Sequence, residues 1–417
     1  QSGTRRLSEA YHRRSDCRLC GGVRLTQVLR LTPTPPANAF ASEAAPQETF
    51  PLDLFFCEDC AHLQLLDVID PEILFRDYVY VSGTSPSFVA HFGAYAADCV
   101  ARFGLGPGDL AVDIGSNDGT LLGFFKKSGL DVLGIDPARK IAAEATKRGI
   151  ETWPEFFGCD VAMRIRGDRG AAKIITANNV FAHADDLDGI AAAARALLAD
   201  DGVFQFEVSY AGAVYEHTLF DTIYHEHVAC HSVQPLQRFF AKHGLELFSI
   251  APINSQGGSI RAMVQLAGGP HGSDGSVDTM IGEEKSLGLD RPETWIAFAD
   301  KIDALKIELR ALLDAIKASG KTIAGFGAPA KATTLMYHFG IGADDLDFIA
   351  DDSPLKQGLY SPGLHIPVLA ASEIYVRNPD YLLILAWNFA APIIAKHRRF
   401  SESGGQFIIP LPKLEVQ

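Results

Sequence analysis

The sequence predicts an α/β protein with two Rossmann-like domains behind a small N-terminal zinc-binding domain. The first observation is a strand, a glycine turn, a helix and a second strand in mid-chain, a pattern that recurs near the C-terminus. The second is two Cys-x-x-Cys motifs near the N-terminus. We expect a zinc-binding domain at 1–75, a central domain at 76–290, a connecting helix at 291–319 and a C-terminal domain at 320–417.

Length, composition and charge limit the possible functions. A chain of 417 residues is too long for one simple core, and 47% hydrophobic with 21% charged residues is ordinary for a globular protein. The formal net charge of −14 argues against a nucleic-acid partner, which requires a basic surface. The sequence has no apolar run of about 18 residues, so no membrane partner is expected. The N-terminus lacks the apolar segment of a secretion signal, and a cytoplasmic location is expected.

Four cysteines form two pairs, Cys17 with Cys20 and Cys57 with Cys60. Each pair places two thiolates on one tight turn, and two such turns supply the four sulfur ligands that Zn²⁺ prefers. The segment between the pairs exceeds the usual spacing of about 15–20 residues, but the entropy of loop closure rises only slowly with length. Because four thiolates complete the coordination, we expect a structural zinc ion rather than a catalytic ion or redox disulfides.

The middle of the chain carries the first strand–turn–helix unit. A helix is expected over 87–103, followed by a buried strand that ends at the turn Gly-Ser-Asn-Asp-Gly, residues 115–119. Gly115 lets the backbone approach a ligand, and Gly119 lets the next helix pack closely. The second strand ends at Asp136, a carboxylate suited to a ribose diol. The turn is not GxGxxG, and its spacing resembles S-adenosylmethionine-dependent methyltransferases more than dehydrogenases.

Residues 173–183 predict a strand that runs into a loop, with Asn179 and His183 at its exit. Ligands of open α/β sheets bind beyond the carboxyl ends of the strands, so both side chains should lie near the cofactor. Another strand is expected at 202–209. The candidate cofactor-binding residues are Gly115, Asn117, Gly119, Asp136 and Asn179.

The segment Asp221-Thr-Ile-Tyr-His-Glu-His227 gathers a phenol, two carboxylates and two imidazoles beside an apolar run. A histidine has an unperturbed pKa of about 6.5, so it can accept a proton near neutral pH and return it. Our hypothesis is that His227 removes a proton from substrate carbon, with Tyr224 and Glu226 shaping the site. A structural polar cluster and a metal site on the two histidines stay open as alternatives. The sequence does not decide between strand, helix and loop here.

Two segments join the central unit to the C-terminal one. Residues 270–289 are rich in Gly and Ser, which indicates an exposed loop. Residues 292–319 predict one long amphipathic helix, because apolar residues recur at helical spacing and indicate packing between domains. The apolar positions are Trp295, Phe298, Ile302, Leu305, Leu309, Leu312 and Ile316.

The C-terminal unit begins with a second glycine turn, Gly325-Phe-Gly-Ala-Pro-Ala330, of the form GxGxxA. It opens a helix, and a strand at 346–352 ends in acidic residues. Such a turn can hold phosphate oxygens at the helix N-terminus, and Lys331 adds positive charge. Three interpretations stay open: an NAD site, a cradle for the diphosphate of a nucleotide-linked substrate, or a structural turn.

Seven motifs occur in an order that resembles one known family. They are CRLCGG with CEDC, DIGSNDG, ANNVFAH, FDTIYHEH, SQGGSIR, GFGAPAKATTL and SPGLHIPV. Along nearly its whole length the chain resembles the nucleotide-sugar C-methyltransferases of deoxysugar biosynthesis, especially those acting at C-3′ of TDP-linked 4-keto-deoxysugars. The resemblance implies an N-terminal zinc-binding domain, a central S-adenosylmethionine domain and a Rossmann-like domain that contributes to nucleotide-sugar binding. The chain departs from the family's pattern at Gln256, where His is expected.

The resemblance also implies a reaction, namely methylation of a carbon beside a ketone. The 4-keto group acidifies the hydrogen on C-3, His227 removes it, and the enolate attacks the methyl group of the sulfonium. Tyr224, Glu226 and His183 would bind or orient the sugar and the enolate oxygen. Donors aimed at this oxygen should supply the larger catalytic effect. The candidate substrate-binding residues are Tyr78, Arg261 and Lys331.

Two rival classes remain at this point. An NAD-dependent nucleotide-sugar oxidoreductase would use the GxGxxA turn, whereas a zinc-ribbon binding module joined to a degenerate methyltransferase would have no activity. Asp136 together with the His227 cluster disfavours the second rival. The sequence does not identify the sugar or decide the oligomeric state, for which a monomer is the expected answer.

Overall fold

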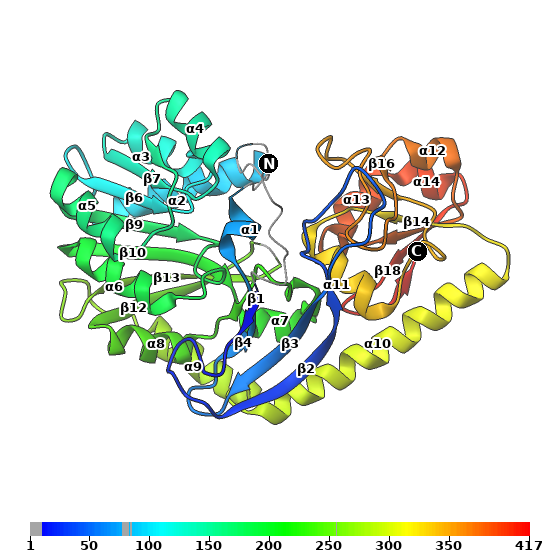
Figure 1. The fold of residues 1–417 in the computed structure, drawn as a ribbon, viewed down its shortest axis with the longest axis horizontal. Helices are drawn as coiled ribbons and strands as arrows, with labels where there is room; N and C mark the ends of the chain where they lie inside the picture. Colours follow the sequence, from blue (N-terminus) through cyan, green and yellow to red (C-terminus); the bar gives the residue numbers. More distant parts are fainter. Residues whose placement is uncertain (1–10, 77–82, 84–85, 256) are drawn as a thin grey trace.

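The structure, a computed structural model, describes residues 11–76, 83, 86–255 and 257–417 (Figure 1). Tyr78 and Gln256, which the sequence singled out, lie outside the described residues. A four-stranded, a seven-stranded and a six-stranded sheet follow one another along most of the chain. No helix in the described part of the chain is both long and apolar enough to span a membrane.

The N-terminal part is built on an antiparallel sheet in the order β11-β4-β3-β2. Its strands are β2 (Leu25–Thr34), β3 (Phe50–Cys57), β4 (Leu63–Leu65) and β11 (Ala229–Cys230). A short ladder pairs β1 (Tyr11–Arg13) with β5 (Asp67–Ile69), and the helix α1 (Pro71–Phe75) follows. Strand β11 comes from mid-chain and begins two residues after His227. The N-terminal sheet therefore fixes one end of the candidate catalytic segment.

The central part is a sheet in the order β12-β13-β10-β9-β6-β7-β8, in which β13 runs antiparallel between β10 and β12. The strands are β6 (Leu110–Ile114), β7 (Asp131–Ile135), β8 (Thr152–Trp153), β9 (Ala172–Asn178), β10 (Leu198–Ser209), β12 (Leu245–Ile253) and β13 (Ser259–Leu266). The helices are α2 (Pro86–Phe103), α3 (Thr120–Lys127), α4 (Arg139–Lys147), α5 (Cys159–Arg169), α6 (Leu187–Leu197), α7 (Ala211–His217), α8 (Val233–Lys242) and α9 (Ser276–Leu287), with a 3₁₀ turn η3 (Phe220–Thr222). Apolar residues of α2 and α3 cover one face of the sheet, and those of α5, α6 and α8 cover the other. Strands buried on both faces explain the nearly continuous apolar runs in the sequence.

The prediction of an exposed loop over 270–289 is wrong, because α9 occupies most of it. Three apolar side chains of this helix and Glu284 are buried. The Glu284 carboxylate accepts hydrogen bonds from two backbone N–H groups at the start of α8, at 2.6 and 3.2 Å. Contacts with distant parts of the chain thus stabilise α9. The Gly- and Ser-rich sequence around this helix does not reveal these contacts.

The predicted long helix is present as α10 (Pro292–Ala318), which runs from the central part to the C-terminal part (Figure 1). Its buried stripe differs from the prediction at one position, since Leu313 is buried and Leu312 only partly so. A period of 3.6 residues lets a stripe advance by three or by four residues, and here the step after Leu309 is four. The other predicted stripe positions are buried.

The C-terminal part is a sheet in the order β16-β15-β14-β17-β18-β19, parallel except for β19. The strands are β14 (Ile323–Phe326), β15 (Ile349–Asp351), β16 (Val368–Ala370), β17 (Tyr381–Ile384), β18 (Gln406–Ile409) and β19 (Glu415–Val416). The helices are α11 (Ala330–Phe339), α12 (Glu373–Arg377), α13 (Ala390–Lys396) and α14 (Arg398–Glu402), with a 3₁₀ turn η4 (Trp387–Phe389).

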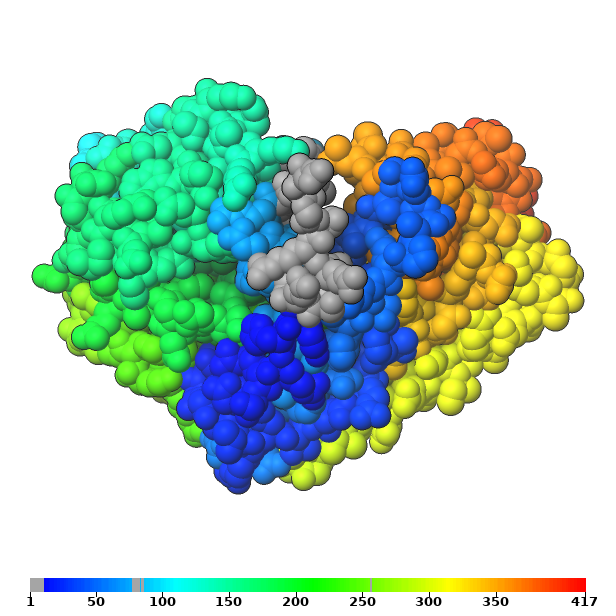
Figure 2. Space-filling model, viewed as in Figure 1, coloured from blue at the N-terminus to red at the C-terminus, as the bar shows by residue number. Residues whose placement is uncertain are grey.

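The three parts meet around the connection from η3 to β11. One apolar cluster contains residues of β2, β3, β4, η3, α10, α11 and the C-terminal sheet. Helix α11 packs against both β2 and η3. On the face shown in Figure 2, residues of the N-terminal part lie between the two larger parts. The YHEH motif, residues 224–227, therefore sits where all three parts come together.

Candidate active site

The first glycine turn leaves the carboxyl end of β6 in a left-handed backbone conformation. Gly115 has a φ of 66°, and an added Cβ there would overlap the side chain of Val180. Gly119 has a φ of 76° at the start of α3, and an added Cβ would lie 2.8 Å from Ile150. Asn117, between them, also has a positive φ, of 50°, which Asn tolerates better than most side chains. Within the turn, Gly115 and Asn117 are partly exposed, whereas Ser116, Asp118 and Gly119 are buried.

Asp136 follows β7 and ties this turn to the next loop. Its Oδ2 accepts the N–H of Asn117 and its Oδ1 accepts the N–H of Ala138, both at 2.8 Å. Burial raises the pKa of Asp136, and these two hydrogen bonds oppose the rise. A carboxylate has about four lone-pair sites, so two backbone bonds leave acceptor capacity for two hydroxyl groups. The residue can thus hold the turn and bind a ribose at once.

Two groups that sequence reasoning missed lie at the ends of β6 and β9. Asp113 is buried and accepts the hydroxyl of Thr176 at 2.6 Å, and burial raises its pKa to about 7. The amide of Asn178 has its nitrogen and its oxygen buried, and neither has a hydrogen-bond partner among the described residues. The predicted residue, Asn179, instead turns out of the strand with a φ of 55°. The sequence hints at Asn178 only through the Asn-Asn pair at the end of β9, because either of these two side chains could have faced the ligand.

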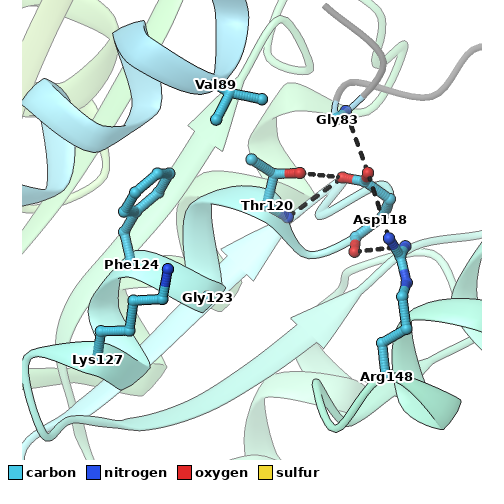
Figure 3. A pocket seen from close by; sticks show the side chains of 8 residues that line it. All are labelled: Gly83, Val89, Asp118, Thr120, Gly123, Phe124, Lys127 and Arg148. Atoms are coloured by element: carbon cyan, nitrogen blue, oxygen red, sulfur yellow. Dashed lines mark hydrogen bonds and ion pairs between the residues drawn. The ribbon is translucent and has the colours of Figure 1, made fainter. Parts of the chain in front are cut away.

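A separate pocket of about 380 Å³ opens against α3, beside the turn (Figure 3). Asp118 organises it, accepting the Thr120 hydroxyl at 2.6 Å and the N–H of Gly83 at 3.1 Å. Arg148 donates to the Asp118 carbonyl at 3.0 Å. None of the predicted site residues lines this pocket. Its bonds stabilise the turn that holds Asn117.

The YHEH motif forms a turn and not a strand, closed by the N–H of His227 donating to the carbonyl of Tyr224 at 2.7 Å. The two histidines of this turn contact different neighbours. His225 is buried, bonds the carbonyl of Pro51 in β3 at 3.1 Å and packs edge-on against Phe50. His225 and His227 therefore do not face a common metal ion.

His227 has one ring nitrogen fixed by the backbone. Its Nδ1 lies 2.6 Å from the carbonyl oxygen of Thr222, and a carbonyl only accepts, so Nδ1 carries the hydrogen. The Nε2 atom is then left with its lone pair. Burial lowers the pKa of His227 to about 4, although the bond to Thr222 opposes this shift. The ring is neutral at pH 7 and presents Nε2 as a base.

A row of stacked rings passes through His227. Tyr224 lies 4.1 Å from it between ring centroids, and His183 lies 4.9 Å away. Phe75 of α1 stacks on His183 at 5.7 Å, with the two rings nearly parallel. Burial, and then the proximity of His227, lower the pKa of His183 well below its usual value. Its buried Nε2 has no hydrogen-bond partner in the described structure, so a bound ligand could supply one.

Glu226 is the one acid within residues 224–227, and it is buried, with 5% of its surface exposed. Its Oε1 accepts the side-chain amide of Asn38 at 3.3 Å, and its buried Oε2 has no partner among the described residues. Burial raises the pKa of Glu226 to about 7, while hydrogen bonds from its own backbone N–H and from Asn38 lower it. Near neutral pH much of this side chain is a carboxylic acid that can donate a hydrogen bond.

Lys331 lies at the second position of α11, but the structure turns its charge toward η3. Its Nζ is 3.3 Å from Oδ2 of Asp221 and 4.1 Å from the ring centroid of Trp387. Trp387 also donates its indole N–H to the same Asp221 oxygen at 2.6 Å. Burial lowers the pKa of Lys331, and the charge of Asp221 opposes this. Lys331 thus joins the C-terminal part to the segment that carries His227.

Arg261 on β13 is separate from the ring stack. It donates to Oε1 of Glu207 at 2.7 Å and lies 4.4 Å from the ring centroid of Tyr95. The other oxygen of Glu207 bonds the ring of His91 at 2.8 Å. These groups form a polar cluster on the α2 face of the sheet. Asn178 pairs with Glu207 on the neighbouring strand, so its side chain lies on the same face.

The four predicted zinc ligands come together. The Sγ atoms of Cys17 and Cys60 are 3.6 Å apart, as are those of Cys20 and Cys57, and all four lie within 4.8 Å of one another. A tetrahedral ion with Zn–S bonds of about 2.3 Å separates its sulfurs by about 3.8 Å, so the group fits Zn²⁺. Within the described residues, no other group of three or more His, Cys, Asp or Glu is spaced to hold a metal.

Comparisons with known proteins agree along the chain. Three family models match in succession: a zinc binding domain over residues 17–75, a methyltransferase domain over 89–250 and a C-methyltransferase C-terminal domain over 254–412. The chain is 37% identical over 404 residues to the C-methyltransferase NovU of Streptomyces niveus, with 96% of both chains covered.

Solved structures give weaker matches. A magnesium protoporphyrin IX methyltransferase from Synechocystis PCC 6803 is 17% identical at a TM-score of 0.33, covering 42% of this chain and 83% of the other. An S-adenosylmethionine-dependent methyltransferase from Clostridium acetobutylicum is 12% identical at 0.35, covering 43% and 92%. Likeness at this level does not extend to function.

Proposed function

Because the chain belongs to the S-adenosylmethionine-dependent C-methyltransferases and carries a structural zinc site, we propose that it methylates C-3′ of a TDP-linked 4-keto-deoxysugar in deoxysugar biosynthesis. S-adenosylmethionine supplies an electrophilic methyl group when bound. The residues proposed to hold it are Gly115, Asn117, Gly119, Asp136 and Asn179, and we add Asn178 and Asp113 to this proposal. The unpartnered amide of Asn178 and the free acceptor capacity of Asp136 fit such a ligand.

One observation carries the proposed mechanism, the bond from Nδ1 of His227 to the Thr222 carbonyl. It fixes the tautomer and the ring orientation, so that Nε2 can remove the C-3 proton of the sugar. The electron pair of the broken C–H bond becomes the enolate. This pair forms the new carbon–carbon bond when the methyl group is transferred.

A neutral imidazole with a pKa near 4 is a weak base for a carbon acid. Much of the rate enhancement must therefore come from donors that stabilise the enolate oxygen as its charge develops. We assign this role to Glu226, whose raised pKa keeps a proton available, with His183 and Tyr224 orienting the sugar. Four cysteines would complete the coordination of a bound zinc ion, so the ion would leave no position for substrate and would have a structural role.

We propose that the nucleotide part binds toward the C-terminal domain, beside the second glycine turn. Lys331 lies at the N-terminus of α11, where backbone N–H groups favour phosphate oxygens. Lys356 is partly buried beside the same turn and donates to the Ala328 carbonyl at 2.5 Å, which adds a second cation. Tyr78 and Arg261 stay proposed as sugar-binding residues.

The substitution His227→Asn tests the base. Turnover should fall on the order of 10²-fold or more, because asparagine cannot accept the proton. S-adenosylmethionine affinity, measured by calorimetry, should not change. Exchange of the C-3 hydrogen with deuterated water, followed by NMR without the methyl donor, should be lost in parallel.

His225→Asn is the matched control, since this histidine faces β3 and asparagine can still bond the Pro51 carbonyl. It should keep exchange and turnover within a few-fold of the wild type. Near-normal turnover in His227→Asn would remove this residue from the base role. Absence of both exchange and methylation in the wild-type protein would refute the proposed substrate.

A further inference from the structure

A loop of the N-terminal part, residues 35–49 between β2 and β3, reaches across to the C-terminal part and to Glu226. Figure 1 draws it in blue beside the C-terminal part. The hydroxyl of Thr333 in α11 donates to the carbonyl of Ala37 at 3.0 Å. Further along the loop, Gln47 accepts the N–H of Gly363 at 2.5 Å. The loop is therefore held on both sides of Asn38, which is its contact with the candidate active site.

The contact between Asn38 and Glu226 is asymmetric. The amide nitrogen of Asn38 donates to Oε1 of Glu226, and no described residue bonds Oε2. A neutral carboxylic acid has one O–H, and an oxygen that already accepts an N–H is the better site for the C=O lone pairs. The proton of neutral Glu226 is then placed on Oε2. A buried O–H without a partner loses hydrogen-bond energy until a ligand accepts it.

We infer that Asn38 is a positioning residue that keeps the proton of Glu226 on Oε2, where it donates to the ketone oxygen of the substrate. This inference rests on the proposed function and adds to it a role for the zinc-binding domain. The proton on Oε2 stays on Glu226 as a hydrogen-bond donor, while the C-3 proton goes to His227. The four cysteines would hold a zinc ion that orders the domain carrying the loop.

The electrostatic surroundings of Glu226 agree with this role. Titratable groups on the elements around it are Tyr224, His225 and His227 in its own turn, Asp221 of η3, Lys331 of α11, and Glu43 and Glu48 of the loop. None of these contributes to the pKa of Glu226, which burial raises and the donors of Asn38 and its own backbone lower. Removing the donor of Asn38 should therefore raise the pKa of Glu226, and placing a second carboxylate there should raise it further.

Two variants at position 38 test the inference. Asn38→Ala should lower kcat about tenfold, because the proton is no longer confined to one oxygen. It should also move the alkaline limb of the pH profile of kcat to higher pH. Asn38→Asp should move this limb further and lower kcat more, because Oε1 of Glu226 would then donate its proton to the introduced carboxylate. If Asn38 presented its oxygen to Glu226 instead, Asn38→Asp would keep wild-type kcat, and that result would overturn the inference.

Gln47→Ala is the matched control, since it loosens the same loop without touching Glu226. It should leave the alkaline limb in place, and an equal shift in this variant would assign the effect to loop position alone. The carboxyl pKa of Glu226, read by ¹³C NMR of labelled protein without substrate, gives a readout independent of the reaction. An unchanged pKa in Asn38→Ala would refute the role of Asn38. A raised pKa in an enzyme that does not methylate keto-sugars would refute the proposed substrate only.

Discussion

Asp136 in the central sheet and Asp351 in the C-terminal sheet end the second strand of their units in the same way. Each uses one oxygen to accept an N–H from its own glycine turn, that of Asn117 at 2.8 Å and that of Ala328 at 2.6 Å. Each uses the other oxygen to accept the N–H two residues further on, at 2.8 and 2.7 Å. In both units, the aspartate at the end of the second strand thus joins that strand to the glycine turn through the same arrangement of hydrogen bonds.

The units differ in what their helices contact. The helix of the first unit, α3, packs against α2 and against the strands β6 and β7 of its own sheet. The helix of the second unit, α11, is docked onto the rest of the molecule, with Thr334 donating to the Ile223 carbonyl at 2.9 Å and Lys331 paired with Asp221. A glycine turn with a terminal acid therefore does not by itself indicate a cofactor site. In the second unit, the helix that follows the turn also joins the C-terminal part to the segment of η3.

The largest effect that separates the units should come from the buried lysine of the second one. Lys331→Met leaves the carboxylate of Asp221 buried without its cation, which typically costs about 3–5 kcal/mol. Urea unfolding should show a loss of that size. The double variant Asp221→Asn with Lys331→Met should recover much of it, because the isolated charge is removed.

Lys127→Met in the last turn of α3 is the control from the first unit, and it should change stability by less than about 0.5 kcal/mol, as surface substitutions usually do. Full stability of Lys331→Met would mean that the Asp221–Lys331 pair does not join the C-terminal part to η3. The two helices would then differ less than their contacts indicate.

The sequence sufficed where structure follows from local pattern. Cysteine spacing predicted the four-thiolate group, and apolar periodicity predicted α10. It failed where contacts between distant segments decide. Whether the YHEH motif is strand or turn depends on the Thr222 carbonyl and on the pairing of β11 with β4.

The choice between Asn178 and Asn179 shows the same limit. Strand β9 continues to Asn178 because it pairs with β10 up to Glu207, and Asn179 then leaves the sheet. A shift of one residue in that register would exchange the two side chains. Likewise, the roles of Asn38 and Lys331 depend on segments far apart in the chain, which no local pattern reveals.

The glycines of the two turns should respond differently to alanine. Both have positive φ, which costs a side chain about 1–2 kcal/mol. At Gly327 the new Cβ would also lie 2.6 Å from Cβ of Ala386, an atom fixed to the backbone. At Gly115 it would meet the end of the Val180 side chain, which can rotate away.

Gly327→Ala should therefore destabilise the protein by about 2–4 kcal/mol and Gly115→Ala by about 1–2 kcal/mol. Thermal unfolding of both variants without ligand measures the difference. S-adenosylmethionine affinity should fall only for Gly115→Ala. A reversed order of stability would show that the first turn is the more tightly enclosed of the two.

The two aspartates provide the smallest but cleanest contrast. Asp136→Ala should weaken S-adenosylmethionine binding by about 1–3 kcal/mol, the value of hydrogen bonds to a charged group. Asp351→Ala should leave this affinity unchanged in calorimetry. Each aspartate accepts two backbone N–H groups, so both variants lose a similar amount of stability and a general weakening of the fold cannot explain a difference in affinity. Equal losses of affinity would mean that both turns respond to the methyl donor, and the contrast between the two units would then fail.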